Sequence, residues 1–450
     1  MVAKLQNLSA FTKVSLVLVA LAYLLQVVTP LRLVYDGIDY LLQASSAIDG
    51  NGFRVHGAEP MRPPGYPALI FLLAKAGMGN SWAIVALNCL LLGVGCWVCY
   101  LLLRRSLQLK GEVAQLICLL TLLSSVMVRN VTYPLSDISY FCASSICLLA
   151  LLHAETDAQT GRFWRLILVL PLAFFCIELR TIGIALIPAF LWVAIGGDAG
   201  ARKTVQWLRQ RKLALWVVML LLVTVTIGII TLHRVFQQSA YIRFNLAILE
   251  RRGVLATIVF DLLAHTTEWG ELILNVTVAK IPSLFHPALP GVGLLPLLLC
   301  GTGIWLRRGK LASLDLYVVA YSCVVLAYPW CDSRLWLPVL PFLMGYVWLG
   351  AMHFVPAEKM RAVSVGYCAF YCLVGVVALG YSTRITLAGP RFPDLYGDGR
   401  LTATYRMAFL GEIPRDAKAI NQDALYLLRR YDWRLTATSH AEKKDLPPRY

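Results

Sequence analysis

Residues 81–103 read SWAIVALNCLLLGVGCWVCYLLL, a run without a single charged residue, and Arg104 and Arg105 follow it directly. A helix needs about 20 apolar residues to cross the hydrocarbon core of a bilayer. A chain in lipid must also satisfy its backbone hydrogen bonds internally, which favours a helix for such a run. The run does not alternate apolar and polar residues, as the strands of a transmembrane β-barrel do. This segment therefore indicates an α-helical integral membrane protein.

The rest of the 450-residue chain has the same character. Its composition is 58% hydrophobic and 15% charged, whereas about a quarter of an ordinary soluble chain is charged. The mean hydropathy is +0.67. The sequence therefore predicts an all-α polytopic bundle of about eleven transmembrane helices. Besides 81–103, the expected spans are residues 14–34, 113–128, 138–152, 166–177, 182–195, 213–232, a run ending at Arg307, 314–329, 335–354 and 363–381.

The formal net charge of +16 does not indicate a nucleic-acid partner, because much of the Lys and Arg lies in short segments between apolar runs. Such positive charge keeps loops in the cytoplasm. With a cytoplasmic N-terminus, the inner loops hold Arg104, Arg105, Lys110, Arg162, Arg165, Arg209, Arg307, Arg308, Lys310, Lys359 and Arg361. An odd number of spans then places the C-terminus outside the cytoplasm. We expect a multi-pass protein of a bacterial inner (plasma) membrane.

The predicted domain organisation is simple. Residues 1–381 form the transmembrane domain, with extracytoplasmic loops at 35–80 and 233–290, and residues 382–450 form a small extracytoplasmic tail. The first apolar run is long and has no clear cleavage site, so we expect a retained span rather than a signal peptide. Most of the 12 cysteines lie inside apolar runs, where cysteine acts as a small hydrophobic residue.

Charged residues also gather where spans meet the predicted outer face. Residues 35–40 read YDGIDY and begin an amphipathic segment, and residues 62–67 read RPPGYP. The two prolines stiffen this corner, so Asp36 after the first span is expected to face the basic residue Arg62. The other outer charges at span ends are Asp39, Asp137, Glu178, Arg180, Asp332 and Arg334.

The order of these segments resembles that of the GT-C superfamily of membrane glycosyltransferases, in the bacterial branch akin to protein O-mannosyltransferases and aminoarabinose transferases. The similarity covers about residues 10–350. It rests on Asp36 with Tyr40 four residues later and on RPPGYP. The further matching segments are PLSD at 134–137, LRTIG at 179–183 and DSRLWLPVLP at 332–341.

The resemblance implies an inverting glycosyltransferase that moves a sugar from a polyprenyl-phosphate-linked donor to a lipid, glycan or protein acceptor on the extracytoplasmic face. It implies Asp36 as the catalytic base. Arginine binds phosphate with a planar fork of donors, which suits a cradle for the donor phosphate. The implied phosphate-binding residues are Arg180, Arg334 and Arg62, and Asp137 and Asp39 would orient the acceptor or a metal. The expected partners are the donor, the acceptor and membrane lipids.

Each of these residues also has a structural alternative. Asp36 and Asp137 could cap helices. Arg180 could pair with Glu178, and Arg334 could be an interfacial anchor. The spacing does not show whether Asp36 and Asp137 share a divalent metal ion, so no cofactor is certain. His233, His265 and His286 are scattered, and their spacing does not indicate a metal site.

For the whole chain, the alternative is a transporter or flippase of a lipid-linked or small anionic substrate. Transporters bind their substrates near the bilayer midplane, whereas here the acids and arginines gather at the outer edge. A structural membrane protein would leave that outer cluster unexplained, and an O-antigen ligase or polymerase gives no reason for the RPPGYP corner.

Overall fold

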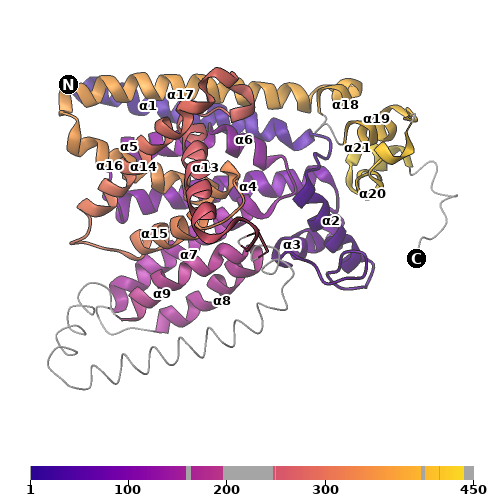
Figure 1. The fold of residues 1–450 in the computed structure, drawn as a ribbon, viewed down its shortest axis with the longest axis horizontal. Helices are drawn as coiled ribbons and strands as arrows, with labels where there is room; N and C mark the ends of the chain where they lie inside the picture. Colours follow the sequence, from indigo (N-terminus) through magenta and orange to yellow (C-terminus); the bar gives the residue numbers. More distant parts are fainter. Residues whose placement is uncertain are drawn as a thin grey trace.

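A computed structural model describes residues 2–158, 164–195, 247–248, 250–396, 401–414 and 416–439. These residues form helices joined by loops, and the one β-type pairing among them is an isolated bridge between Val55 and Ala58. Figure 1 shows long helices that lie side by side in a bundle, with a group of small helices at one end. The prediction of an all-α chain is confirmed for the described residues.

The described helices include five segments that are long and apolar enough to cross a membrane, or six when one bent pair counts as a single span. This confirms a multi-pass membrane protein, whereas the count of about eleven stays a prediction. The span expected at 213–232, together with Arg162 and the basic cluster near Arg209, lies outside the described residues. The five segments contain α4 (Ser81–Arg105), α7 (Ser136–Ala158), α14 (Leu289–Leu306), α16 (Leu340–Phe354) and α17 (Ala357–Thr386).

The third expected span, 113–128, is not one straight helix, and this corrects the prediction. It consists of α5 (Gly111–Leu122) and α6 (Ser125–Val131), which are bent by 58° at the break. Asn275 supplies the physical reason. Its side-chain amide donates to the Leu123 carbonyl at 2.9 Å, and its side-chain oxygen accepts from the Ser125 N–H at 2.6 Å. These bonds satisfy backbone groups that the break would otherwise leave unpaired.

Other helices correspond to the remaining expected spans that the structure describes. The runs 166–177 and 182–195 form α8 (Trp164–Leu179), the 3₁₀ turn η2 (Thr181–Ala185) and α9 (Leu186–Ala194), with Arg180 at the junction. The run 314–329 forms α15 (Ser313–Leu326). The 3₁₀ helix η5 (Ser333–Val339) leads directly into α16. The chain begins with α1 (Val2–Leu25) and the 3₁₀ turn η1 (Gln26–Val28).

The expected outer loop 233–290 contains a 21-residue helix, α13 (Val254–Leu274), which packs against α14. Small residues allow this close packing, as they do between helices in membranes. A Cβ atom at Gly293 of α14 would lie 1.7 Å from the Thr266 carbonyl oxygen of α13. The backbones of α13 and α14 therefore touch at a position that only glycine can occupy.

We predict that Gly293→Ala destabilises the protein by at least about 1–3 kcal/mol, the usual cost of overpacking a tight interface. The obstructing atom belongs to the backbone, so a side-chain rotation cannot relieve the clash. Gly291 on the same helix is the matched control, because a Cβ atom there would have no neighbour within 4 Å. Thermal unfolding in detergent should show a lower midpoint for Gly293→Ala alone. Equal midpoints for the two variants would contradict the packing described here.

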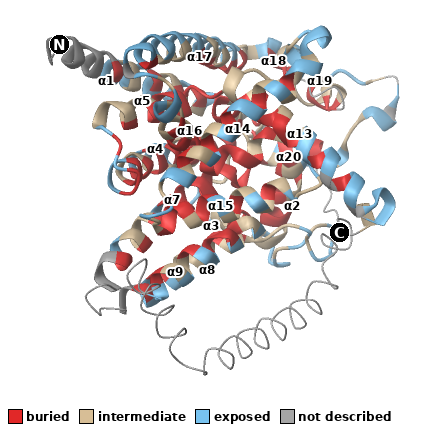
Figure 2. Cartoon of the chain, turned by 60° about the vertical axis from the view of Figure 1, so that its left-hand side comes forward, coloured by how far each residue is buried: buried red, intermediate tan, exposed pale blue. Residues whose placement is uncertain are grey.

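Burial follows the position of each helix in the bundle. Figure 2 shows buried residues concentrated in the central helices, whereas α17 at the edge is largely exposed. The exposed side chains of α17 are mostly apolar and include Val363, Val365, Phe370, Leu373, Val376 and Val377. An apolar surface of this length is suited to contact with lipid rather than water.

Among the described residues, four α-helices follow α17, namely α18 (Phe392–Leu395), α19 (Thr402–Leu410), α20 (Gln422–Tyr431) and α21 (Trp433–Ser439). They lie beside α2 (Tyr35–Ile48) at one end of the bundle (Figure 1). Their side chains bind the backbone of the non-helical segment that precedes α2. Asp432 accepts from the Leu31 N–H at 2.6 Å, and the Tyr405 hydroxyl accepts from the Leu33 N–H at 2.8 Å. The C-terminal region therefore fixes the position of the backbone at the start of α2, where Asp36 lies.

Candidate active site

Asp36 lies in the first turn of α2, where its carboxylate meets the corner formed by residues 62–67. The N-cap residue of α2 is Val34, which makes no side-chain cap, and Asp36 instead faces Arg62. The Arg62 guanidinium donates to Asp36 at 2.5 Å and to Asp39 at 3.2 Å. One arginine therefore bridges two carboxylates that lie one helical turn apart on α2.

A second guanidinium reaches Asp36 from the opposite end of the sequence. Arg334 in η5 donates to the other carboxylate oxygen of Asp36. Arg334 also forms an ion pair of 2.8 Å with Asp332, which caps the start of η5 through the Arg334 N–H at 3.0 Å. The Asp36 carboxylate therefore lies between two guanidinium groups, and Arg334 pairs with two carboxylates, those of Asp36 and Asp332.

Asp137 and Arg180 form a second pair. Asp137 lies in the first turn of α7, and Arg180 joins α8 to η2 and donates to Asp137. The two side chains are only 3% and 15% exposed, respectively. The sequence left Glu178 as an alternative partner of Arg180. In the structure Arg180 contacts Asp137, and this contact connects the end of α8 with the start of α7.

Contacts of Tyr40 and Gly65 connect the group around Asp36 with the Asp137–Arg180 pair. The Tyr40 hydroxyl lies 2.9 Å from the Ser136 hydroxyl at the start of α7, and the Arg62 guanidinium lies 5.8 Å from the Tyr40 ring centroid. A Cβ atom at Gly65, which begins α3 (Gly65–Lys75), would lie 2.5 Å from the Glu178 carbonyl oxygen. All six side chains expected at the site therefore belong to one region, and their individual roles remain predictions.

The carboxylates in this region favour the charged form of Arg62. Burial alone would lower the pKa of the Arg62 guanidinium, but the carboxylates of Asp36 and Asp39 outweigh it and raise that pKa. A guanidinium carries five N–H donors, and Arg62 uses two of them on these carboxylates. The cluster therefore combines fixed positive charge, further donor capacity and a carboxylate with limited exposure.

A second charged cluster lies at the other end of α7. Glu155 there accepts from the Ser313 N–H at 3.3 Å, and Arg307 forms an ion pair of 2.8 Å with Asp315. Asp137 and Glu155 are 18 positions apart on one helix, which corresponds to about 27 Å at 1.5 Å per residue. The cluster around Asp36 therefore lies at one end of the bundle, about a membrane thickness from the other charged end.

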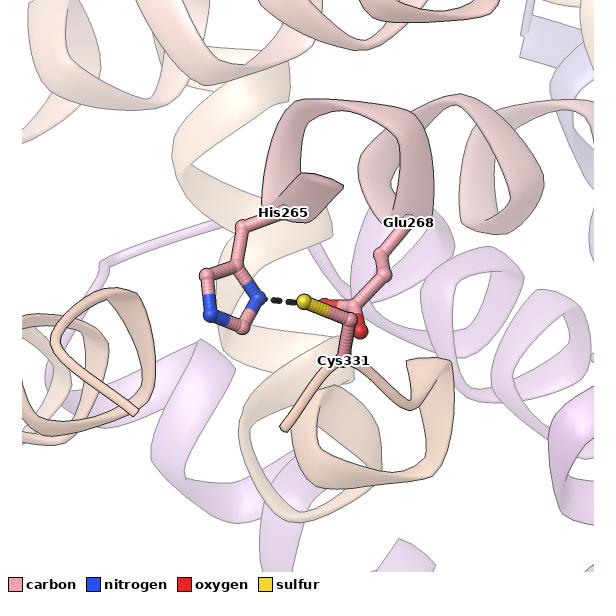
Figure 3. A group of neighbouring side chains, drawn as sticks. All are labelled: His265, Glu268 and Cys331. Atoms are coloured by element: carbon pink, nitrogen blue, oxygen red, sulfur yellow. Dashed lines mark hydrogen bonds and ion pairs between the residues drawn. The ribbon is translucent and has the colours of Figure 1, made fainter. Parts of the chain in front are cut away.

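One group of potentially reactive side chains was missed by the sequence reasoning. His265 on α13 lies beside Glu268 and Cys331, and the ligand atoms of the three residues lie within 4.8 Å of one another (Figure 3). A histidine followed by a glutamate three positions later is a weak signal by itself. Cys331 is 66 positions away from His265 in the sequence, so its proximity follows only from the fold.

The chain is similar in fold to ArnT, a GT-C membrane glycosyltransferase, which confirms the resemblance at the level of fold. Among the solved structures that match are two crystal structures of ArnT, the aminoarabinose transferase, from Cupriavidus metallidurans. One is bound to undecaprenyl phosphate and the other is in the apo state. Both match with a TM-score of 0.50 at 14% identity and cover 98% of this chain, and they cover 90% and 89% of the ArnT chain, respectively. No protein-family model matches the sequence, and no curated protein sequence matches it significantly.

Proposed function

We propose that this protein is an inverting glycosyltransferase that moves a sugar from a polyprenyl-phosphate-linked donor to a lipid, glycan or protein acceptor on the extracytoplasmic face. The observation that carries the proposal is the position of the Asp36 carboxylate between the guanidinium groups of Arg62 and Arg334. A proton acceptor and a phosphate-binding group side by side are what this transfer requires. The GT-C fold gives independent support.

In the proposed reaction, Asp36 accepts the proton of an acceptor hydroxyl or amine as that group attacks the anomeric carbon. The bond between the anomeric carbon and the phosphate oxygen breaks on the opposite face, and polyprenyl phosphate leaves with the bonding electrons. A single displacement inverts the configuration at the anomeric carbon. Arg334, Arg180 and Arg62 would stabilise the negative charge that develops on the leaving phosphate.

The contacts of Arg334 leave donors free to bind the phosphate of the leaving group. Arginine can bind a carboxylate and a phosphate at the same time because its donors point along more than one edge of the guanidinium plane. Arg334 contacts Asp36 through Nη2 and pairs with Asp332 through Nε. A phosphate that binds to its remaining donors would leave Asp36 beside the reacting centre rather than displace it.

An apolar cavity could hold the prenyl chain of the proposed donor. Its volume is about 1160 Å³, and its lining residues come from α5, α13, α14, α16 and α17. Trp269 in its wall contacts Trp336 with 5.3 Å between ring centroids. Trp336 follows Arg334 by two positions, so the apolar wall and the phosphate-binding group share η5. The undecaprenyl phosphate bound to ArnT supports a polyprenyl-phosphate ligand here.

The transporter or flippase alternative has less support. Substrate sites of transporters lie near the middle of the membrane, whereas the carboxylate and guanidinium groups described here lie at the ends of α7, α8 and η5. The base and the phosphate-binding groups also touch directly, which a transporter does not require.

We predict that Arg334→Gln lowers the affinity for polyprenyl phosphate about 10- to 100-fold, because a charged hydrogen bond contributes about 1.5–3 kcal/mol. Binding of polyprenyl phosphate alone to the purified protein in nanodiscs measures this without knowledge of the sugar. Arg334→Lys should fall in between, since lysine keeps the charge but not the planar fork.

Arg308→Gln is the matched control, because Arg308 follows the far end of α14 and stacks on Trp305 at 4.2 Å. Its affinity for polyprenyl phosphate should equal that of the unaltered chain. Unchanged binding by Arg334→Gln would remove Arg334 from the proposed cradle.

A further inference from the structure

His265, Glu268 and Cys331 form a group of nitrogen, oxygen and sulfur donors outside the cluster around Asp36. His265 and Glu268 lie one helical turn apart on α13, and Cys331 lies in the loop between α15 and η5 (Figure 3). The ligand atoms lie within 4.8 Å of one another. Ligands of a tetrahedral Zn²⁺ are separated by roughly 3.3–3.8 Å, given metal–ligand bonds of about 2.0–2.3 Å. A movement of about 1 Å by the Cys331 loop would complete that geometry.

The hydrogen bonds of His265 orient one ring nitrogen toward the group. Its Nε2 lies 3.0 Å from the Tyr328 carbonyl oxygen, which can only accept, so Nε2 carries the proton. The Nδ1 atom faces the Glu268 carboxylate at 2.7 Å. At this distance the contact is a hydrogen bond that holds a proton, and a metal ion would replace that proton and move the two atoms apart to about 3.3 Å. Donation of the second ring N–H to a backbone carbonyl is the usual arrangement of a metal-ligating histidine.

Glu268 supplies a second and independent observation. Its side chain is nearly fully buried, yet its Oε1 atom has no hydrogen-bond partner. The other oxygen, Oε2, accepts from the Trp336 indole N–H at 2.8 Å, which fixes the carboxylate in place. A buried carboxylate oxygen without a donor is costly, and a bound cation would satisfy it.

We propose that His265, Glu268 and Cys331 bind a divalent cation of the zinc class. The mixed set of imidazole, carboxylate and thiolate suits Zn²⁺, and three protein ligands leave a fourth position for water. Binding would release the Cys331 thiol proton to solvent. The exposure of Cys331 provides the entry path. The site would clamp to α13 the loop that carries Cys331 and Asp332. Because η5 follows this loop directly, the clamp would also position Arg334 beside Asp36.

The test uses the purified full-length chain in detergent, stripped with a chelator and titrated with Co²⁺. One Co²⁺ should bind per chain and give the charge-transfer absorption of a cobalt–thiolate bond, and Zn²⁺ should displace it. Cys331→Ser should abolish that absorption without unfolding the protein, because the side chain is exposed. Trp336→Phe removes the bond to Glu268 together with part of the ring contacts with Trp269 and His265, and it should weaken Co²⁺ binding about 10- to 100-fold, as losses of outer-shell partners do.

Cys323→Ser is the matched control, since Cys323 is the other cysteine on α15 or the following loop and is also exposed. Its cobalt spectrum should equal that of the unaltered chain. The proposal is overturned if the unaltered chain shows no cobalt–thiolate absorption, or if Cys331→Ser leaves that absorption intact. These outcomes do not depend on glycosyl transfer, so they can fail separately from the proposed function.

Discussion

Replacement of Asp36 by asparagine is expected to reduce sugar transfer about 10²- to 10⁴-fold, the usual contribution of a positioned general base. Asparagine keeps the size of the side chain, and its one amide oxygen can still accept a hydrogen bond from Arg62 or Arg334, but it cannot take the acceptor's proton. The chain should therefore still fold and bind polyprenyl phosphate. The loss should appear in the rate of the chemical step.

The measurement compares release of polyprenyl phosphate from a series of labelled polyprenyl-phosphate sugars in the presence of membrane acceptors. Asp49→Asn is the matched control, because Asp49 ends the same helix and pairs with Arg430 at 2.8 Å, far from the cluster. Its transfer rate should equal that of the unaltered chain. Undiminished transfer by folded Asp36→Asn protein would remove Asp36 from the mechanism.

The residues of the candidate site could be singled out from the sequence because charge is costly next to apolar spans. A carboxylate or guanidinium at the end of such a run needs a partner, which directs attention to Asp36, Asp137, Arg180 and Arg334. The structure brings these side chains together. The sequence could not supply the pairing itself, because Arg334 lies 298 positions from Asp36 and several arginines were equally available.

Features that depend on distant partners were not predictable in the same way. The break between α5 and α6 follows an unremarkable apolar run, and the residue that stabilises it, Asn275, lies 150 positions from Ser125. The tie between Asp432 and the Leu31 backbone joins opposite ends of the chain. Local periodicity predicts the helices, but it contains no information about which distant polar side chain satisfies a given backbone group.

The C-terminal helices are connected to the proposed chemistry by these ties. Asp432, Tyr405 and Tyr396 hold the backbone of residues 31–33, and α2 begins two residues later with Asp36 in its first turn. A general base must be held within hydrogen-bond reach of the proton that it accepts. The region from α18 to α21 thus acts on Asp36 through backbone position rather than through direct contact.

The second large effect is expected at Arg180. Arg180→Gln should destabilise the protein by about 3–5 kcal/mol, the usual result when one partner of a buried ion pair is removed. Asp137 is only 3% exposed, so it would be left as an uncompensated buried charge. Thermal unfolding in detergent measures the loss, and Arg308→Gln again serves as the control at the opposite end of the bundle.

The double variant Arg180→Gln with Asp137→Asn separates a structural role of this pair from a functional one. Removal of both charges should restore most of the stability, because a buried ion pair adds little over two neutral partners. Binding of polyprenyl phosphate should stay weak if Arg180 contacts the donor phosphate, since the restored fold still lacks that cation. Recovery of both stability and binding would show that Arg180 serves only to neutralise Asp137, and the phosphate cradle would then reduce to Arg62 and Arg334.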